Sequence, residues 1–133
     1  MARILVVDDD PLFLAIMTRA LEKAQHTVIA APDGTQAIEH LDKDSFDALV
    51  CDLVLPNPTG LQVIRHARHG QPEMPIVAIS GGKANGKSVH VDVFHMAQTV
   101  GATTLIKKPF ELREFVATVA ASLEPARKSG VAG

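Results

Sequence analysis

Short apolar runs alternate along this chain with stretches that have helical spacing, and the alternation predicts its secondary structure. Runs of Val, Ile and Leu without strict polar alternation are typical of strands that are covered on both faces of a parallel sheet. The runs that predict strands are Arg3 to Val7, Thr27 to Ala31, Ala48 to Asp52, Ile76 to Ile79 reaching Ser80, and Leu105 with Ile106.

Apolar residues between these strands recur every three or four positions, which predicts amphipathic helices. The first helix is expected to begin at Pro11, with Asp10 as its N-cap, and to end near Ala24. Its apolar stripe is predicted as Leu12, Ile16, Ala20 and Ala24, widened by Phe13, Met17 and Leu21. The other helices are predicted around Ala37, Ile38 and Leu41; around Leu61, Val63, Ile64 and Ala67, with Arg65 and Arg68 on the polar face; around Val93, Phe94, Ala97 and Val100; and around Leu112, Phe115, Val116, Val119, Ala120 and Leu123.

Strands that alternate with helices favour right-handed crossovers and a doubly wound α/β sandwich of three layers. The chain has 133 residues, of which 47% are hydrophobic and 21% charged, and this suits one compact domain with a sizeable core. We expect the domain to span residues 1–124 and residues 125–133 to form a flexible tail.

The charge and cysteine content narrow the function classes. A formal net charge of -2 shows no electrostatic footprint for nucleic acid, so direct nucleic-acid binding is not expected. The only cysteine is Cys51, which we interpret as a small buried hydrophobe in a reducing compartment. The apolar run near the start is too short for a signal peptide or a membrane span, and we expect a cytoplasmic protein without membrane insertion.

Polar side chains stand where four of the five predicted strands end. They are Asp8 and Asp9, Asp52, Ser80, and Lys108. The carboxyl ends of parallel strands are where ligands collect in such sheets, and clustered carboxylates repel one another unless a cation joins them. Carboxylate oxygens favour a hard ion, and Mg²⁺ fits better than Ca²⁺ because no oxygen cage is evident. A carboxylate, a metal, an ammonium and a hydroxyl are the parts that hold a phosphoryl group.

Over nearly its whole length the chain resembles the receiver domain of two-component response regulators. The matching motifs are Val7-Asp8-Asp9, Asp52 followed by Pro56 and Gly60, Ser80, and Lys108-Pro109-Phe110. The resemblance implies a flavodoxin-like sheet of strand order 2-1-3-4-5 with helices on both faces, and a cis peptide bond at Lys108-Pro109.

The same resemblance implies roles for individual residues. Asp52 would accept a phosphoryl group from a histidine kinase or a histidine phosphotransferase, and Ser80 and Lys108 would contact the phosphoryl oxygens. Mg²⁺ would be held by Asp8, Asp9, Asp52 and the backbone carbonyl of Val54. Such a protein catalyses its own phosphorylation and dephosphorylation but is mainly a signalling switch, and here its output is expected through an unknown protein partner and not through an attached output domain.

Three features depart from the resemblance or refine it. Leu105 stands where the family usually carries an aromatic switch residue, and the segment after Ser80 is longer than usual and rich in Gly and Lys. We expect this segment, Gly81 to Ser88, to be a mobile activation loop that carries part of the signal. The side chains two positions beyond Asp52 and Ser80 are Val54 and Gly82; since neither can orient an attacking water, we expect slow loss of the phosphoryl group.

Gly81 to Ser88 also matches the P-loop pattern G-x-x-x-x-G-K-[ST], so the alternative function is a small nucleotide-binding protein. Against it, every predicted strand that ends in an acid precedes the motif, whereas such a strand usually follows a P-loop. A phosphatase with an Asp-x-Asp nucleophile is disfavoured because Val54 takes the place of the second Asp. His66 with His69, and His90 with His95, lack a third ligand at suitable spacing, so we expect solvated histidines and not a zinc site.

Overall fold

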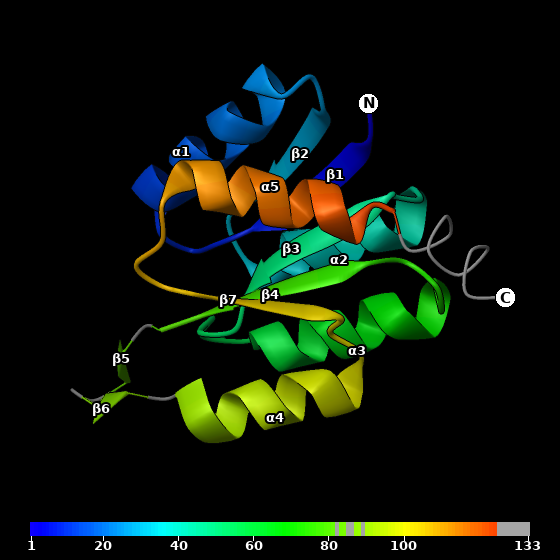
Figure 1. The fold of residues 1–133 in the computed structure, drawn as a ribbon. Helices are drawn as coiled ribbons and strands as arrows, with labels where there is room; N and C mark the ends of the chain where they lie inside the picture. Colours follow the sequence, from blue (N-terminus) through cyan, green and yellow to red (C-terminus); the bar gives the residue numbers. More distant parts are fainter. Residues whose placement is uncertain (82, 85–86, 89, 125–133) are drawn as a thin grey trace, which may run out of the picture.

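A five-stranded parallel sheet forms the centre of the protein (Figure 1). The structure is a computed structural model that describes residues 1–81, 83–84, 87–88 and 90–124. The strand order is β2-β1-β3-β4-β7, so the predicted order 2-1-3-4-5 is confirmed, with β7 as the fifth strand of this sheet. The strands are β1 (Arg3–Val7), β2 (Thr27–Ala31), β3 (Ala48–Asp52), β4 (Ile76–Ser80) and β7 (Thr104–Lys107).

Helices cover both faces of this sheet (Figure 1), as predicted. They are α1 (Pro11–Lys23), α2 (Gly34–Lys43), α3 (Gly60–Gly70), α4 (His90–Val100) and α5 (Leu112–Ser122). Alternate residues of the strands point to opposite faces: Ile4 and Val6 pack in the cluster under α1 and α5, whereas Leu5 and Val7 pack in the cluster under α2, α3 and α4. The unbroken apolar runs in the sequence therefore serve two separate cores.

The predicted apolar stripe of α1 was wrong in part. Leu14, Met17 and Leu21 face the sheet, whereas Leu12 is 69% exposed and Ile16 is 37% exposed. Residues two apart on a helix lie on nearly opposite sides, so a helix that buries Leu14 turns Leu12 outward. α5 shows the same effect: Phe115 and Val119 are buried, but Leu112, also predicted for the stripe, is 41% exposed. Both helices carry apolar residues around much of their circumference, and packing decided which side is buried.

The segment after β4 differs from a simple loop. It contains two short antiparallel strands, β5 (Lys83–Ala84) and β6 (Lys87–Ser88), and α4 begins at His90. A P-loop places its Lys and Ser/Thr directly at the start of a helix, whereas here both residues lie in β6, so the context that this motif requires is not met. Residues 82, 85–86 and 89 lie outside the described residues, and the expectations of a mobile loop and of a role for Gly82 stay predictions.

Arg68 was predicted with Arg65 on the polar face of α3, and the structure shows that its guanidinium has backbone partners. Its half-buried guanidinium donates hydrogen bonds to the backbone carbonyl oxygens of Gly101 (2.6 Å to Nη2), Gln71 (3.1 Å) and Pro72 (2.7 Å). These carbonyls follow the ends of α4 and α3, where helices leave acceptors without an internal partner. Arg68 therefore joins the two helix ends, and its charged guanidinium binds backbone carbonyl oxygens within the protein.

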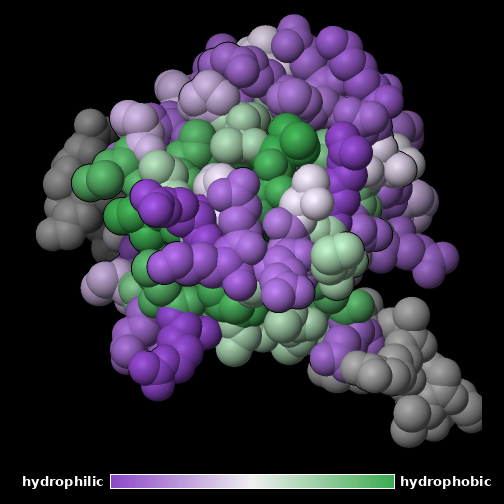
Figure 2. All heavy atoms as spheres, turned by 90° about the horizontal axis from the view of Figure 1, so that it is seen from above, coloured by the Kyte–Doolittle hydropathy of each residue, from purple (hydrophilic) through white to green (hydrophobic). Residues whose placement is uncertain are grey.

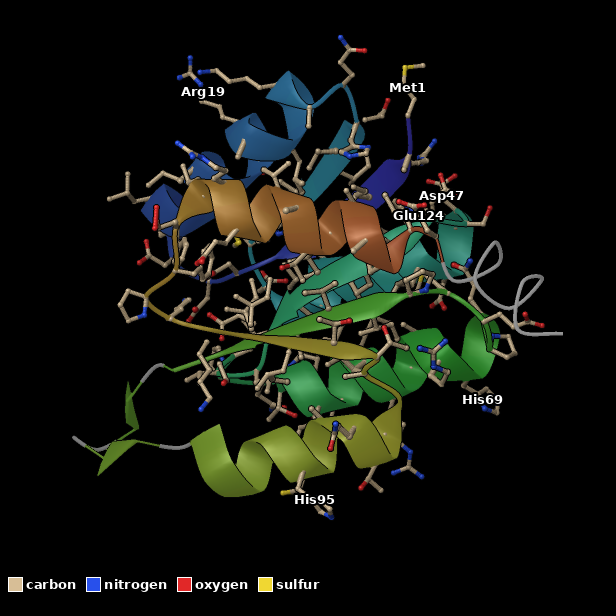
Figure 3. The ribbon with its side chains drawn as sticks, in the orientation of Figure 1. Met1, Arg19, Asp47, His69, His95 and Glu124 are labelled. Carbon is tan, nitrogen blue, oxygen red and sulfur yellow. The ribbon has the colours of Figure 1, made fainter. Side chains whose placement is uncertain are left out.

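The other polar residues of α3 and α4 whose side chains the structure describes are exposed. His69 and His95 lie on the outer surfaces of α3 and α4 (Figure 3), and His66 pairs with Asp42 at 2.7 Å, both on the surface. Residues 125–133, predicted as a tail, lie outside the described part of the chain. Within the described part, no helix has both the length and the apolar character needed to cross a bilayer.

Candidate functional site

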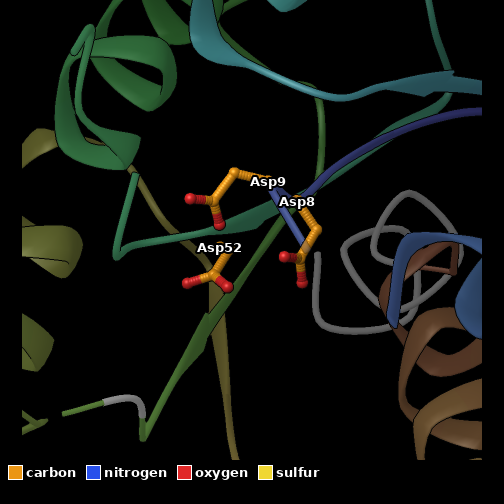
Figure 4. A group of neighbouring side chains, drawn as sticks. All are labelled: Asp8, Asp9 and Asp52. Carbon is orange, nitrogen blue, oxygen red and sulfur yellow. The ribbon is translucent and has the colours of Figure 1, made fainter. Parts of the chain in front are cut away.

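Three aspartates meet at the carboxyl edge of the sheet (Figure 4). Asp8 follows β1 and Asp52 ends β3, and since β1 and β3 are parallel neighbours, both strands deliver their carboxylates to the same place. Asp8 and Asp52 are buried, and Asp9 is exposed beside them. One ligand oxygen of each residue lies within 4.8 Å of the other two. The sequence prediction that these three residues come together is confirmed.

The turn from β1 into α1 holds Asp8 in position. Asp8 Oδ1 accepts a hydrogen bond from the backbone N–H of Asp10 (2.9 Å). Asp10 in turn caps α1, as predicted: its Oδ1 accepts from the N–H groups of Leu12 (3.0 Å) and Phe13 (3.3 Å). The three aspartates after β1 therefore have different roles: Asp10 caps α1, whereas Asp8 and Asp9 lie in the acidic cluster.

Asp52 is held from its own strand end. Its Oδ1 accepts a hydrogen bond from the N–H of Val54 (2.8 Å). Gly60, at the start of α3, approaches the backbone of Asp52 and Leu53 so closely that a Cβ at position 60 would overlap both. Cys51 is fully buried next to Asp52, and burial raises the pKa of its thiol well above the usual range. A thiol with such a pKa stays protonated, which agrees with its predicted role as a small hydrophobe.

Lys108 brings the cation to this cluster. Its Nζ donates hydrogen bonds to Asp52 Oδ2 (2.9 Å) and Asp8 Oδ2 (3.4 Å). Its backbone N–H donates to the carbonyl oxygen of Ser80 (2.6 Å), which ties the end of β7 to the end of β4. The peptide bond between Lys108 and Pro109 is cis, as predicted; that between Asn57 and Pro58 is also cis, which the sequence analysis did not predict.

The electrostatics favour a charged ammonium among the carboxylates. Burial raises the pKa of Asp8, and the charge of Asp52 adds to the effect, while the hydrogen bond from Asp10 and the charge of Lys108 oppose it. Burial alone would lower the pKa of Lys108, but the hydrogen bond to Asp52 and the charges of Asp52 and Asp8 outweigh it and raise this pKa. Three carboxylates against one ammonium leave an excess of negative charge.

That excess, and the chemistry of the donors, fit a divalent cation. All three side chains offer carboxylate oxygens, the ligands that Mg²⁺ prefers, and the exposed Asp9 leaves access from solvent. The predicted contribution of the Val54 carbonyl stays a prediction.

Ser80 completes the edge of the sheet. Its side chain is fully buried, and among the described residues its hydroxyl has no hydrogen-bond partner. A buried hydroxyl without a partner costs free energy in the protein alone, which is tolerated where a ligand supplies the missing acceptor. A hydroxyl, an ammonium and a carboxylate at the ends of β4, β7 and β3 suit an incoming phosphoryl group.

Gly81 is a contributor that sequence reasoning missed, since it was assigned to the Gly-rich segment. Its φ is +116°, and a Cβ there would lie 2.7 Å from both the backbone N and O of Lys108. The position therefore requires glycine, because only glycine leaves room for the lysine backbone. No signal in the sequence connects these residues.

A doubly wound parallel sheet with an acidic cluster, a lysine and a hydroxyl at its carboxyl edge defines the receiver class of signalling proteins. The chain belongs to the response regulator receiver domain family, whose sequence model matches residues 4–120. The recognition made from the motifs is confirmed.

Two relatives illustrate the family. Response regulator MprA of Mycobacterium ulcerans is 35% identical over 121 residues, which cover 91% of this chain and 50% of MprA. Transcriptional regulatory protein TcrA of Mycobacterium tuberculosis is 32% identical over 120 residues, which cover 90% of this chain and 45% of TcrA. The chain thus spans about half the length of the curated relatives it matches.

The solved structure supports the fold alone. A CheY-like response regulator receiver domain protein from Methanospirillum hungatei superposes with a TM-score of 0.87 at 22% identity, over 97% of this chain and 98% of that chain.

Proposed function

We propose that this chain is a phosphorylation switch in which Asp52 accepts a phosphoryl group from a phosphohistidine of a histidine kinase or histidine phosphotransferase, in a reaction that depends on Mg²⁺. The observation that carries the proposal is the buried Asp52 carboxylate at the end of β3, bonded to Lys108 and flanked by Asp8 and Asp9. Output passes to a protein partner. In this proposal the chain works in the cytoplasm, where reducing conditions suit its single thiol.

The proposed chemistry is a transfer between two nucleophiles. A carboxylate oxygen of Asp52 forms a bond to phosphorus, the bond between phosphorus and the imidazole nitrogen breaks, and its electron pair stays on that nitrogen. The product is an acyl phosphate on Asp52. Mg²⁺, held by Asp8, Asp9, Asp52 and the Val54 carbonyl, would supply neutralisation of the phosphoryl charge.

Lys108 and Ser80 have distinct roles in this proposal. Before transfer, the Lys108 ammonium bonds Asp52 Oδ2 and holds the carboxylate in place. After transfer, the ammonium donates to a phosphoryl oxygen, and the Ser80 hydroxyl gains the acceptor that it lacks among the described residues. These new hydrogen bonds link phosphorylation of Asp52 to the positions of the ends of β4 and β7.

The phosphodonor needs a surface beside this site. α1 and α5 both begin at the edge of the sheet that carries the aspartates and Lys108, and a groove between them is lined by the apolar side chains of Ile16, Leu112 and Val116. Figure 2, seen from above, shows apolar surface on this face among hydrophilic side chains. Basic residues line the same groove: Arg19, Lys23 and Arg113. We infer that it receives a helix of the phosphodonor with apolar side chains flanked by acidic ones.

Radioactive acetyl phosphate and a cognate kinase test the function directly. We expect label on the wild-type chain with Mg²⁺, little label when EDTA removes the metal, and release of the label by hydroxylamine, which cleaves acyl phosphates. Asp52→Ala should take up no label, and Asp42→Ala, which removes a surface aspartate, should behave like the wild type. Label that persists on Asp52→Ala would show that another residue is the acceptor.

A further inference from the structure

The ammonium of Lys108 has a third neighbour besides its two carboxylates. Its Nζ lies 4.2 Å from the centroid of the Phe13 ring. The face of an aromatic ring attracts a cation within about 6 Å, because the ring quadrupole places negative charge there. Phe13 therefore contacts the residue that holds Asp52, although it is not itself polar.

Phe13 is held firmly where it can do this. It lies in the first turn of α1, and its backbone N–H is one of the two groups capped by Asp10. Its ring packs on Phe110 with centroids 5.3 Å apart, and Phe110 stacks on the fully buried Phe115, also at 5.3 Å. The row Phe13, Phe110 and Phe115 runs from the site into the core under α1 and α5. A ring supported in this way stays over the lysine.

We propose that Phe13 is a positioning residue for the phosphoryl reaction, whose ring face holds the Lys108 ammonium while that ammonium exchanges the Asp52 carboxylate for a phosphoryl oxygen. This inference rests on the function proposed above.

The physical reason is that a hydrogen bond to a carboxylate is directional, and it weakens when Asp52 becomes an acyl phosphate because the remaining carbonyl oxygen carries no charge. Attraction to a ring face depends much less on direction, so the ammonium keeps it while turning from one oxygen to the other. The Lys108 side chain is only 19% exposed, so water alone does not hold its charge in place during the exchange. The ring thus lowers the free energy needed to move the Lys108 ammonium from the Asp52 carboxylate to a phosphoryl oxygen.

A series of fluorinated phenylalanines at position 13 separates electrostatics from packing. Successive fluorines weaken the negative face of the ring and leave its shape nearly unchanged. We expect the rate of Asp52 labelling by acetyl phosphate to fall with each fluorine, by roughly two- to fivefold at three fluorines, and by a similar factor in Phe13→Leu. The same series at Phe46, a buried ring in the core on the other side of the sheet, should leave the rate unchanged.

A second readout needs neither phosphoryl group nor metal. Protons above a ring face are shielded, so the side-chain resonances of Lys108 in ¹³C-lysine-labelled protein should be shifted upfield in the wild type. The shift should remain in the fluorinated proteins and disappear in Phe13→Leu, which would place the ring over the lysine in solution.

The outcomes are distinct. A labelling rate that is the same with every fluorinated ring, in a protein whose Asp52 is labelled normally, would overturn the role of Phe13 and leave the proposed function standing. Lys108 resonances without an upfield shift in the wild type would also overturn it. Failure of wild-type Asp52 to take up label would overturn both proposals.

Discussion

At the scale of single residues, the site depends on positions where a Cβ has no room. Gly81 combines a φ of +116° with close approach to the backbone of Lys108, and Gly60 lies against the backbone of Asp52. These glycines allow the strand ends to come near enough for Lys108 to reach the carboxylates. The chemistry thus rests on residues that have no side chain.

Gly81→Ala should therefore displace Lys108. A left-handed backbone costs an alanine about 1 kcal/mol, and overlap with Lys108 adds to this, so we expect the free energy of unfolding to fall by roughly 1–3 kcal/mol. Denaturant titration measures this loss, and labelling by acetyl phosphate should slow by about tenfold or more. Gly70→Ala is the matched control, since a Cβ there meets nothing within 4 Å. Equal losses in the two variants would contradict this explanation.

We expect His26 to make the free energy of unfolding depend on pH. Its ring Nδ1 accepts a hydrogen bond from the N–H of Ala2 (3.1 Å), and burial together with the nearby N-terminal charge lowers its pKa from the ordinary 6.5. A pKa that is lower in the folded state gives a contribution that is fully present above pH 6.5 and is lost as pH falls through the folded value.

Denaturant titrations between pH 7.5 and about pH 5 test this, because they follow the protonation of an imidazole. We expect the wild type to lose stability on acidification, and His26→Gln, which keeps an acceptor but does not titrate, to lose less. His69→Gln changes an exposed histidine on α3 and should follow the wild type. Parallel curves for His26→Gln and the wild type would rule out this contribution.

At the scale of elements, α1 and α5 each have two apolar sides. One side packs on the sheet through Met17, Leu21, Phe115 and Val119, and the other lines the groove through Ile16 and Val116. An apolar side that solvent can reach costs solubility, and patches of this kind are typical of docking surfaces. We therefore expect the phosphodonor to bind in this groove.

Leu12→Glu with Ile16→Glu tests the groove: Ile16 lines it, and Leu12 lies one helical turn before Ile16 on the same side of α1. Both side chains are already exposed, so folding should be nearly unaffected, while the new charges should repel an acidic partner and remove apolar contact. We expect phosphotransfer from a cognate kinase to slow by roughly tenfold or more and labelling by acetyl phosphate to stay the same. Met96→Glu, on α4, is the matched control because Met96 is 50% exposed away from this groove. Unchanged phosphotransfer in the double variant would exclude the groove as the docking surface.

At the scale of the whole molecule, we expect the acidic cluster to couple metal binding to folding. The three aspartates come from two strand ends that meet only in the folded chain, so an ion that binds there stabilises the native state alone. We expect Mg²⁺ at ten times its dissociation constant to add about 1.4 kcal/mol to the free energy of unfolding.

The measurement is denaturant unfolding with and without Mg²⁺ at constant ionic strength. Asp8→Asn should lose most of the gain, since it removes a charged ligand from the cluster, whereas Asp42→Asn on the surface should keep it. An equal gain in Asp8→Asn would place the metal elsewhere.

The sequence by itself determined the order along the chain of the five sheet strands and the five helices, the parallel sheet and the residues at its carboxyl edge. Those features are local or topological: Val- and Leu-rich runs predict buried strands, Asp10 caps the helix that follows it, and parallel neighbours bring Asp8 and Asp52 to one edge whatever the details of packing. The motifs then indicated the family without any distance being known.

Only the tertiary structure decided which side of α1 is buried, that Gly81 makes room for Lys108, and that Phe13 lies over the ammonium. The apolar positions of α1 surround so much of the helix that periodicity allows more than one buried side, and packing against β1 and α5 selects one. The contacts of Lys108 join residues far apart in the chain, and neither spacing nor composition encodes such distances. They follow from how two cores fill the space on either side of the sheet, because close packing leaves one arrangement for the side chains at its edge.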